Sequence, residues 1–151
     1  MPAWILDETV FKRSLEAPCT DAAEDLDAAK VLGYVQAHGR WVFSDAIRER
    51  YLSNWKMKTC TAPLTVRTFL SLRNLMWDAE RSLLLDGVEA INGRYHGDDE
   101  FIVSAAAAVR EDAILVTEDG RLRTRLAMTG IPAEFGFTVV DVAGALAIQA
   151  V

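Results

Sequence analysis

The chain has 151 residues and a mass of 16.7 kDa, with 51% apolar and 25% charged residues, the proportions of one ordinary folded domain. Its apolar runs are a few residues long, far short of the ~18 that a membrane-spanning helix needs. No basic segment followed by an apolar run stands near Met1, and two cysteines are too few for a disulfide framework or a four-cysteine zinc site. We therefore expect a cytoplasmic protein without membrane contact, in which Cys19 and Cys60 are ordinary thiols.

The formal net charge is −6, which by itself argues against a protein built to coat nucleic acid. The charge is unevenly distributed, however, because residues 1–30 carry −4, residues 40–81 carry +4 and residues 86–120 carry −7. The positions of the acids are therefore more informative than their number.

Short apolar runs alternate with helical patterns along the chain. Thr20 and Ser44 are the expected N-caps of the first two helices, and Pro63 fits the first turn of the third. This alternation predicts a single α/β domain over residues 1–151, with a largely parallel central sheet and helices on both faces. In chain order we expect a strand over 3–6, a helix over 21–38, a strand over 41–43, helices over 45–55, 63–85 and 101–109, a strand over 113–116, a helix over 122–128, a strand over 137–140 and a short alanine-rich helix.

Carboxylates stand beside predicted strand ends at three points of the chain. Asp7 and Asp119 each follow a buried strand, and Asp98 and Asp99 open the helix over 101–109. Ligands of open parallel sheets bind beyond the carboxyl ends of the strands, so these side chains are expected to meet at one edge. Clustered carboxylates repel one another and need a cation, and oxygen ligands select Mg²⁺ or Mn²⁺. Such a site suits phosphodiester hydrolysis, although each acid taken alone is equally well explained as a helix cap or turn residue.

Three segments resemble the motifs of the PIN-domain ribonucleases, which include the VapC-like toxins, in that family's order. They are Ile5–Phe11, with Asp7 after the opening strand; Asp99–Ala106, an acid heading an alanine-rich helix; and Ile114–Asp119, a strand followed by Thr-x-Asp. The resemblance implies a PIN-like three-layer sandwich and a Mg²⁺- or Mn²⁺-dependent hydrolase that cuts single-stranded RNA. It also implies Asp7, Asp99 and Asp119 as metal-binding catalytic acids, with Asp98 in reserve. Many members are toxins of toxin–antitoxin pairs, so a protein antitoxin and a homodimer are expected partners.

The sequence departs from the family pattern at two positions. Where the family has a glutamate on the helix after the second strand, Arg50 stands here and Glu49 comes one residue early. One residue rotates a helical side chain by ~100°, so Glu49 is a doubtful fourth acid. Arg121 replaces the family's frequent second acid after Thr-x-Asp. A catalytically degenerate binding or regulatory module is therefore the alternative function.

Basic residues beside the predicted site suggest contacts to an RNA backbone. Arg121 and Arg125 are one helical turn apart, where they could hold a phosphate or pair with nearby acids. Arg50 belongs to a mixed basic and aromatic stretch that could bind RNA, though aromatics at helical spacing are more often packing residues. A phosphotransfer enzyme is less favoured, because Asp7 lacks a second Asp two residues on and the chain has no glycine-rich phosphate loop.

Overall fold

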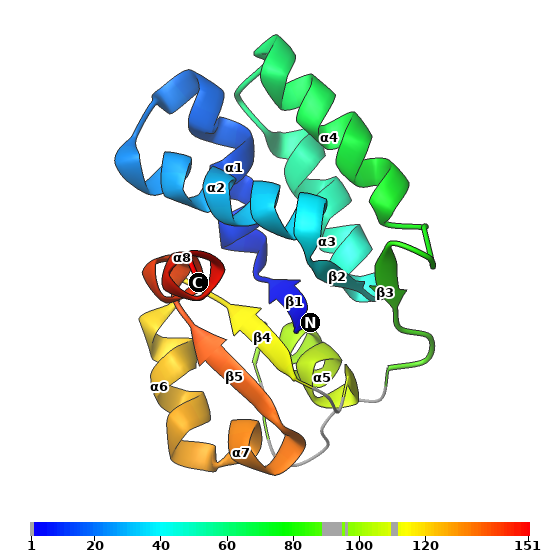
Figure 1. The fold of residues 1–151 in the computed structure, drawn as a ribbon, viewed down its shortest axis with the longest axis vertical. Coiled ribbons are helices and arrows are strands. Elements are labelled where there is room, and N and C mark those ends of the chain that lie inside the picture. The colour runs from blue at the N-terminus through cyan, green and yellow to red at the C-terminus, as the bar shows by residue number, and fades with distance from the viewer. Residues whose placement is uncertain (1, 89–94, 96, 110–111) are drawn as a thin grey trace.

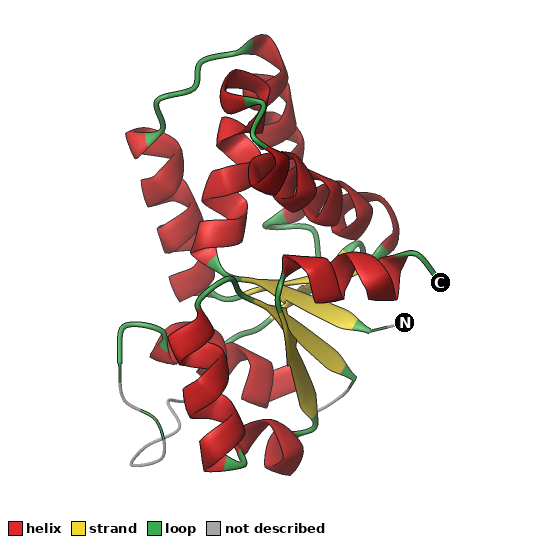
Figure 2. Cartoon of the chain, turned by 90° about the vertical axis from the view of Figure 1, so that its left-hand side faces the viewer, coloured by secondary structure: helices red, strands yellow, loops and turns green. Residues whose placement is uncertain are grey.

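The computed structural model describes residues 2–88, 95, 97–109 and 112–151 (Figure 1). It is an α/β structure in which helices lie on both faces of a central sheet (Figure 2). The elements in chain order are β1 (Ala3–Leu6), α1 (Glu8–Thr20), α2 (Ala23–His38), β2 (Arg40–Phe43), α3 (Asp45–Met57), α4 (Pro63–Leu75), β3 (Ser82–Leu84), α5 (Glu100–Val109), β4 (Ala113–Val116), α6 (Gly120–Thr129), α7 (Ile131–Phe135), β5 (Phe137–Val140) and α8 (Val142–Gln149).

The described strands form one five-stranded sheet in the order β3-β2-β1-β4-β5, and every neighbouring pair is parallel. α5, α6 and α7 cover one face, while α1, α2 and α8 lie on the other, with α3 and α4 packed against α1 (Figures 1 and 2). The predicted three-layer α/β sandwich is therefore confirmed. Its central strand is β1, whose last residue, Leu6, is in register with Val116 at the end of β4.

The central strands are apolar throughout because helices cover both of their faces. All four residues of β1 and all four of β4 are buried, as is expected for the middle of a parallel sheet. Trp4 and Ile5 are among the most deeply buried side chains of the core. The two strands are thus held rigidly, and the residues that follow them, Asp7 and Thr117, start from fixed positions.

Helix α1 is the largest difference from the sequence-based prediction, which left residues 8–20 without an element. Val10, Phe11 and Leu15 are among its buried residues, and their helical spacing was available in the sequence. Thr20 was predicted to cap the next helix, and this is wrong: Thr20 ends α1, and Ala22 stands at the N-cap of α2. The Thr20 hydroxyl instead donates to a carboxylate oxygen of Asp25 at 2.6 Å.

The helix predicted over 63–85 was too long. α4 ends at Leu75, and β3 follows as an edge strand beside β2. Between them the Asp78 carboxylate accepts hydrogen bonds from the backbone N–H groups of Glu80 and Arg81, at 3.0 and 3.3 Å. This side-chain turn reverses the chain and is the local signal that the helical prediction overlooked.

Cys19 and Cys60 are bonded to each other in a disulfide, so the prediction of ordinary thiols was wrong. The bond ties the C-terminal end of α1 to the connection between α3 and α4. The pairing was hidden in the sequence because 41 positions separate the cysteines and α1 itself was not predicted. Disulfides persist mainly in oxidising compartments, and cytoplasmic localisation therefore stays a prediction.

No helix in the described parts of the chain is both long enough and apolar enough to cross a lipid bilayer.

Candidate functional site: strand-end carboxylates

We call Asp7, Glu8, Asp98, Asp99 and Asp119 the acidic edge, and Asp7 is its most deeply buried carboxylate. It follows β1 and is only 3% exposed. Its Oδ2 accepts a hydrogen bond from the Thr117 hydroxyl at 2.7 Å, whereas its Oδ1 is buried without a hydrogen-bond partner in the described structure. Burial raises the pKa of the Asp7 carboxyl to about 6; the charge of Asp99 adds to the rise, and the Thr117 hydrogen bond opposes it.

Thr117 connects Asp7 with Asp119 through a single hydroxyl. While it donates to Asp7, the same oxygen accepts a hydrogen bond from the Asp119 backbone N–H at 3.1 Å. Thr117 is fully buried, so its geometry is fixed by β4. The ends of β1 and β4 are thereby joined by side-chain contacts as well as by the sheet.

Asp119 is an N-cap and also part of the acidic edge. Its Oδ1 accepts hydrogen bonds from the backbone N–H groups of Arg121 and Leu122, at 3.0 and 3.2 Å, and so caps α6. The helix-capping role that the sequence left open for Asp119 is therefore confirmed for its Oδ1. It does not remove Asp119 from the site, because the charge of Asp119 acts on Asp99.

Asp99 approaches the same edge from the start of α5. Its backbone carbonyl accepts hydrogen bonds from the N–H groups of Ile102 and Val103, at 3.1 and 3.2 Å. Burial raises the pKa of the Asp99 carboxyl, as do the charges of nearby carboxylates, of which Asp119 acts most strongly. The charges of Asp99 and Asp7, and those of Asp119 and Asp99, are thus close enough to interact, and the exposed Asp98 also acts on Asp99.

Glu8 is a further carboxylate of this edge that sequence reasoning did not select. It lies in the first turn of α1, and its charge acts on both Asp7 and Asp99. Two residues of α3 hold it: Arg50 at 3.6 Å, as an ion pair, and Asn54, whose amide donates at 3.4 Å. Recognising that a helix begins directly after Asp7 would have placed Glu8 here.

Arg50 lies beside Glu8 at the acidic edge, whereas Glu49 lies elsewhere on α3. The Arg50 guanidinium pairs with Glu8 and lies 4.7 Å from the centre of the Phe101 ring. Glu49 instead lines a separate hollow together with Arg48 and Trp77. The one-residue offset along α3 therefore puts a cation, not a carboxylate, beside Glu8.

Arg121 and Arg125 line a broad hollow along α6, next to Asp119. Arg125 lies over the ring of Tyr95, 4.6 Å from its centre, and its charge opposes the rise in the pKa of Asp99. Both arginines therefore place positive charge in the hollow next to Asp119.

Tyr95 is a second residue that the sequence did not single out. Its side chain is 3% exposed, and its hydroxyl has no hydrogen-bond partner within the part of the chain that is described. Burial raises the pKa of the phenol, as do the charges of Asp99, Asp119 and Asp7, against the effect of Arg125. Tyr95 is thus a neutral donor placed among carboxylates, and no sequence pattern marks it.

The acidic edge fits a divalent cation in its chemistry but is not closed around one. Among the described residues, no group of three or more His, Cys, Asp or Glu side chains is placed so that it could hold a metal ion. The donors are nevertheless all oxygens, and the buried Asp7 Oδ1 lacks any partner. Two of the acids also have raised pKa values, which is the electrostatic strain that a cation relieves. Binding of an ion would require side-chain movement.

The chain was compared with models of known protein families and with curated protein sequences. Neither comparison found a match.

Proposed function

We propose that this chain is a metal-dependent endoribonuclease that cleaves single-stranded RNA, of the PIN-domain type. The observation that carries the proposal is the buried Asp7 carboxylate at the end of the central strand. One of its oxygens is held by Thr117 and the other has no partner in the described structure, while Asp99 and Asp119 act on its surroundings. A charged group kept in this state costs stability, and such costs are typical of functional sites.

In this proposal Asp7, Asp99 and Asp119 hold Mg²⁺ or Mn²⁺, and Asp98 and Glu8 shape the local charge. When bound, the ion supplies activation of the attacking water and stabilisation of the leaving oxygen. Thr117 fixes the Asp7 carboxylate, and the α6 cap fixes Asp119. Arg121 and Arg125 contact the phosphate backbone of the RNA from α6, since both line the hollow beside Asp119.

The direct test is RNA cleavage by the purified protein with Mn²⁺, after EDTA, and after Mn²⁺ is added back. Cleavage should require the metal, and Asp7→Asn should lower the rate at least about a hundredfold, because a catalytic metal contributes several kcal/mol to transition-state stabilisation. Folding of the variant is checked by circular dichroism. Cleavage that survives EDTA, or full activity of a folded Asp7→Asn protein, would overturn the proposal.

A catalytically degenerate binding module is the second candidate function. Two observations favour it: the acids of the described residues are not gathered tightly enough for a metal, and Arg50 occupies the position beside Glu8. This candidate predicts that the protein binds RNA without cutting it and takes up no Mn²⁺ in calorimetry. Saturable Mn²⁺ binding followed by RNA turnover would exclude it.

A role as the toxin of a toxin–antitoxin pair, and assembly as a homodimer, are further parts of the proposal. An apolar stripe along α4 and just beyond its end supports a protein partner, because Val66 and Leu70 are exposed one helical turn apart on α4 and Trp77, two residues after the helix, is 64% exposed. Light scattering of the purified chain tests the dimer. A monomer at all concentrations would exclude the homodimer, and the apolar stripe would then be a candidate binding surface for a different protein, such as an antitoxin.

A further inference from the structure

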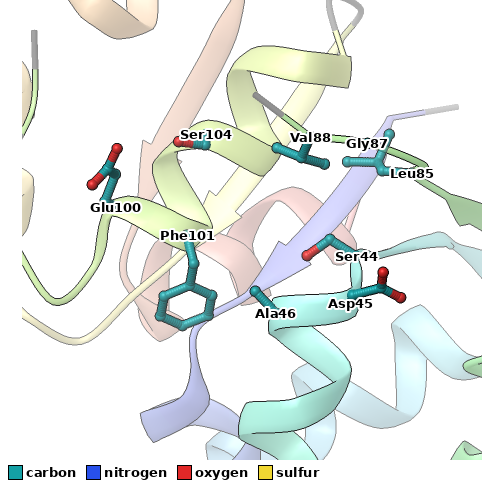
Figure 3. A pocket seen from close by; sticks show the side chains of 9 residues that line it. All are labelled: Ser44, Asp45, Ala46, Leu85, Gly87, Val88, Glu100, Phe101 and Ser104. Carbon is teal, nitrogen blue, oxygen red and sulfur yellow. The ribbon is translucent and has the colours of Figure 1, made fainter. Parts of the chain in front are cut away.

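A cavity of about 450 Å³ lies beside the acidic edge, between the N-terminal end of α3 and the first half of α5. Figure 3 shows its lining: Phe101 and Ser104 on α5, Ala46 in the first turn of α3 with the N-cap Ser44 before it, and Leu85 and Val88 on the segment after β3. We call it the α3–α5 cavity. Its volume falls within the range of pockets that take small-molecule ligands.

The α3–α5 cavity is connected to the acidic edge through Phe101 and Arg50. Phe101 lines the cavity and lies two residues after Asp99. Its ring is also in contact with Arg50, which pairs with Glu8. A strand of RNA whose phosphate lies at Asp99 would therefore bring its neighbouring nucleotide to the mouth of this cavity.

The cavity offers an aromatic wall with hydrogen-bonding groups at its edges. Ser104 is 4% exposed, and its hydroxyl has no hydrogen-bond partner in the described parts of the chain. Across the cavity, the Ser44 side chain accepts from Ile47, while Asp45 and Ala46 are first-turn residues whose N–H groups cannot bond within the helix. Asp45 and Glu100 also line the cavity, so its edges carry acceptors as well as donors. Apolar side chains and an aromatic ring with such polar edges match a nucleobase, which is flat and carries donors and acceptors on its rim.

We propose that the α3–α5 cavity binds one base of the substrate RNA, next to the phosphodiester held at the acidic edge. The inference rests on the proposed function for its substrate. The base lies against Phe101, whose ring Arg50 supports, and its polar rim meets Ser104 and the start of α3. RNA is then recognised by a base at this point, in addition to the backbone contacts of the arginines on α6.

Ala46→Phe tests the proposal, because Ala46 is exposed on α3 and a phenyl ring there would fill the cavity. The matched control is Ala37→Phe, at an exposed helical alanine of α2 that does not line the cavity. Fluorescence anisotropy in EDTA measures the binding of an RNA decamer and of the same decamer without any bases. The quantity compared is the ratio of the two affinities, which isolates the contribution of the bases.

Wild type and Ala37→Phe should prefer the intact decamer, and in Ala46→Phe this preference should fall about tenfold, the size of one lost base–aromatic contact. All three proteins should bind the base-free decamer equally, which also reports correct folding. An unchanged preference in Ala46→Phe, or no RNA binding by wild type, overturns the inference. If the preference behaves as expected but Mn²⁺ then produces no cleavage, the base-binding cavity stands and the ribonuclease proposal fails.

Discussion

At the scale of single residues, the hydroxyl of Thr117 organises the acidic edge. It donates to Asp7 and accepts from the Asp119 backbone, so one buried side chain fixes two of the proposed metal-binding acids. Partners that orient metal ligands are typically nearly as important as the ligands. Thr117 is therefore a positioning residue whose loss should affect activity without touching substrate.

Thr117→Val keeps the shape of the side chain and removes the hydroxyl. Among the described residues, Asp7 thereby loses the side-chain hydrogen bond to its carboxylate and keeps only a backbone one. We expect RNA cleavage to fall about 10- to 100-fold and stability to fall by about 1–3 kcal/mol. Thr117→Ser restores the hydroxyl and should restore the rate. Equal rates for the valine and serine variants would show that the hydroxyl does not position Asp7.

The raised pKa of Asp7 makes stability depend on pH in a defined direction. The folded protein holds the proton more tightly than the unfolded chain, whose carboxyl has a pKa of 3.8, because burial raises the folded value to about 6. The stabilising contribution of protonated Asp7 in the metal-free protein is therefore fully present below about pH 4 and is lost as the pH rises through 6. Relative to Asp7→Asn, wild type should lose up to about 3 kcal/mol between pH 4 and pH 7. Urea unfolding in EDTA measures this, and parallel pH profiles of the two proteins would contradict it.

How much of the site was predictable differs from residue to residue. Asp7, Asp99 and Asp119 stand at strand or helix ends, and the rule that parallel strands end at one edge is enough to place them together. Glu8 was missed because its place depends on α1 starting directly after Asp7. Tyr95 was missed for a different reason, since its contact with Arg125 is a tertiary contact that no local pattern encodes.

At the scale of elements, the disulfide joins segments whose packing the sequence did not reveal. Cys19 lies in the last turn of α1, while Cys60 is buried in the connection before α4. Thr65 of α4 strengthens this junction, because its hydroxyl donates to the backbone carbonyl of Leu15 at 2.8 Å. The helices that carry Glu8, Arg50 and the apolar stripe of α4 are thus anchored to one another at the end away from the sheet.

Reduction should destabilise the protein, because the bond closes a loop of 41 positions and a loop of this size is worth about 4 kcal/mol in the chain-entropy estimate. Thermal unfolding with and without a phosphine reductant measures the loss. Cys19→Ala should unfold at the temperature of the reduced wild type and should not respond to the reductant. If reduction left the melting temperature of the wild type unchanged, the disulfide would contribute nothing to the stability of the fold.

Elements with a clear apolar run were predictable, and those defined by side-chain turns were not. β1, β4 and β5 have the expected bounds, since each is a short apolar run closed by polar residues. The strand β3 was absorbed into a predicted helix, because its three residues continue the apolar spacing of α4 and only the Asp78 turn separates them. The short helix α7 was missed as well, between two glycines with positive φ.

At the scale of the whole molecule, the net charge of −6 is compatible with an RNA substrate. The acidic segments 1–30 and 86–120 supply Asp7, Glu8, Asp99 and Asp119, which converge on one sheet edge and would be partly neutralised by a bound cation. The basic stretch 40–81 supplies Arg50 beside that edge. Acidic and basic segments that are separate in the sequence thus contribute acidic and basic side chains to the same edge of the sheet.

The central claim is that the acids of this edge catalyse metal-dependent RNA hydrolysis, and a pair of matched variants tests it most directly. Asp119 and Asp141 both follow a strand at this edge and both cap a helix, through contacts that asparagine can also make. Of these two residues, Asp119 is the one whose charge raises the pKa of Asp99.

The measurement is the single-turnover rate of RNA cleavage with Mn²⁺ for wild type, Asp119→Asn and Asp141→Asn. The account predicts a loss of at least about a hundredfold in Asp119→Asn and a rate within about twofold of wild type in Asp141→Asn. Equal rates for the two variants, or cleavage by none of the three folded proteins, would contradict it.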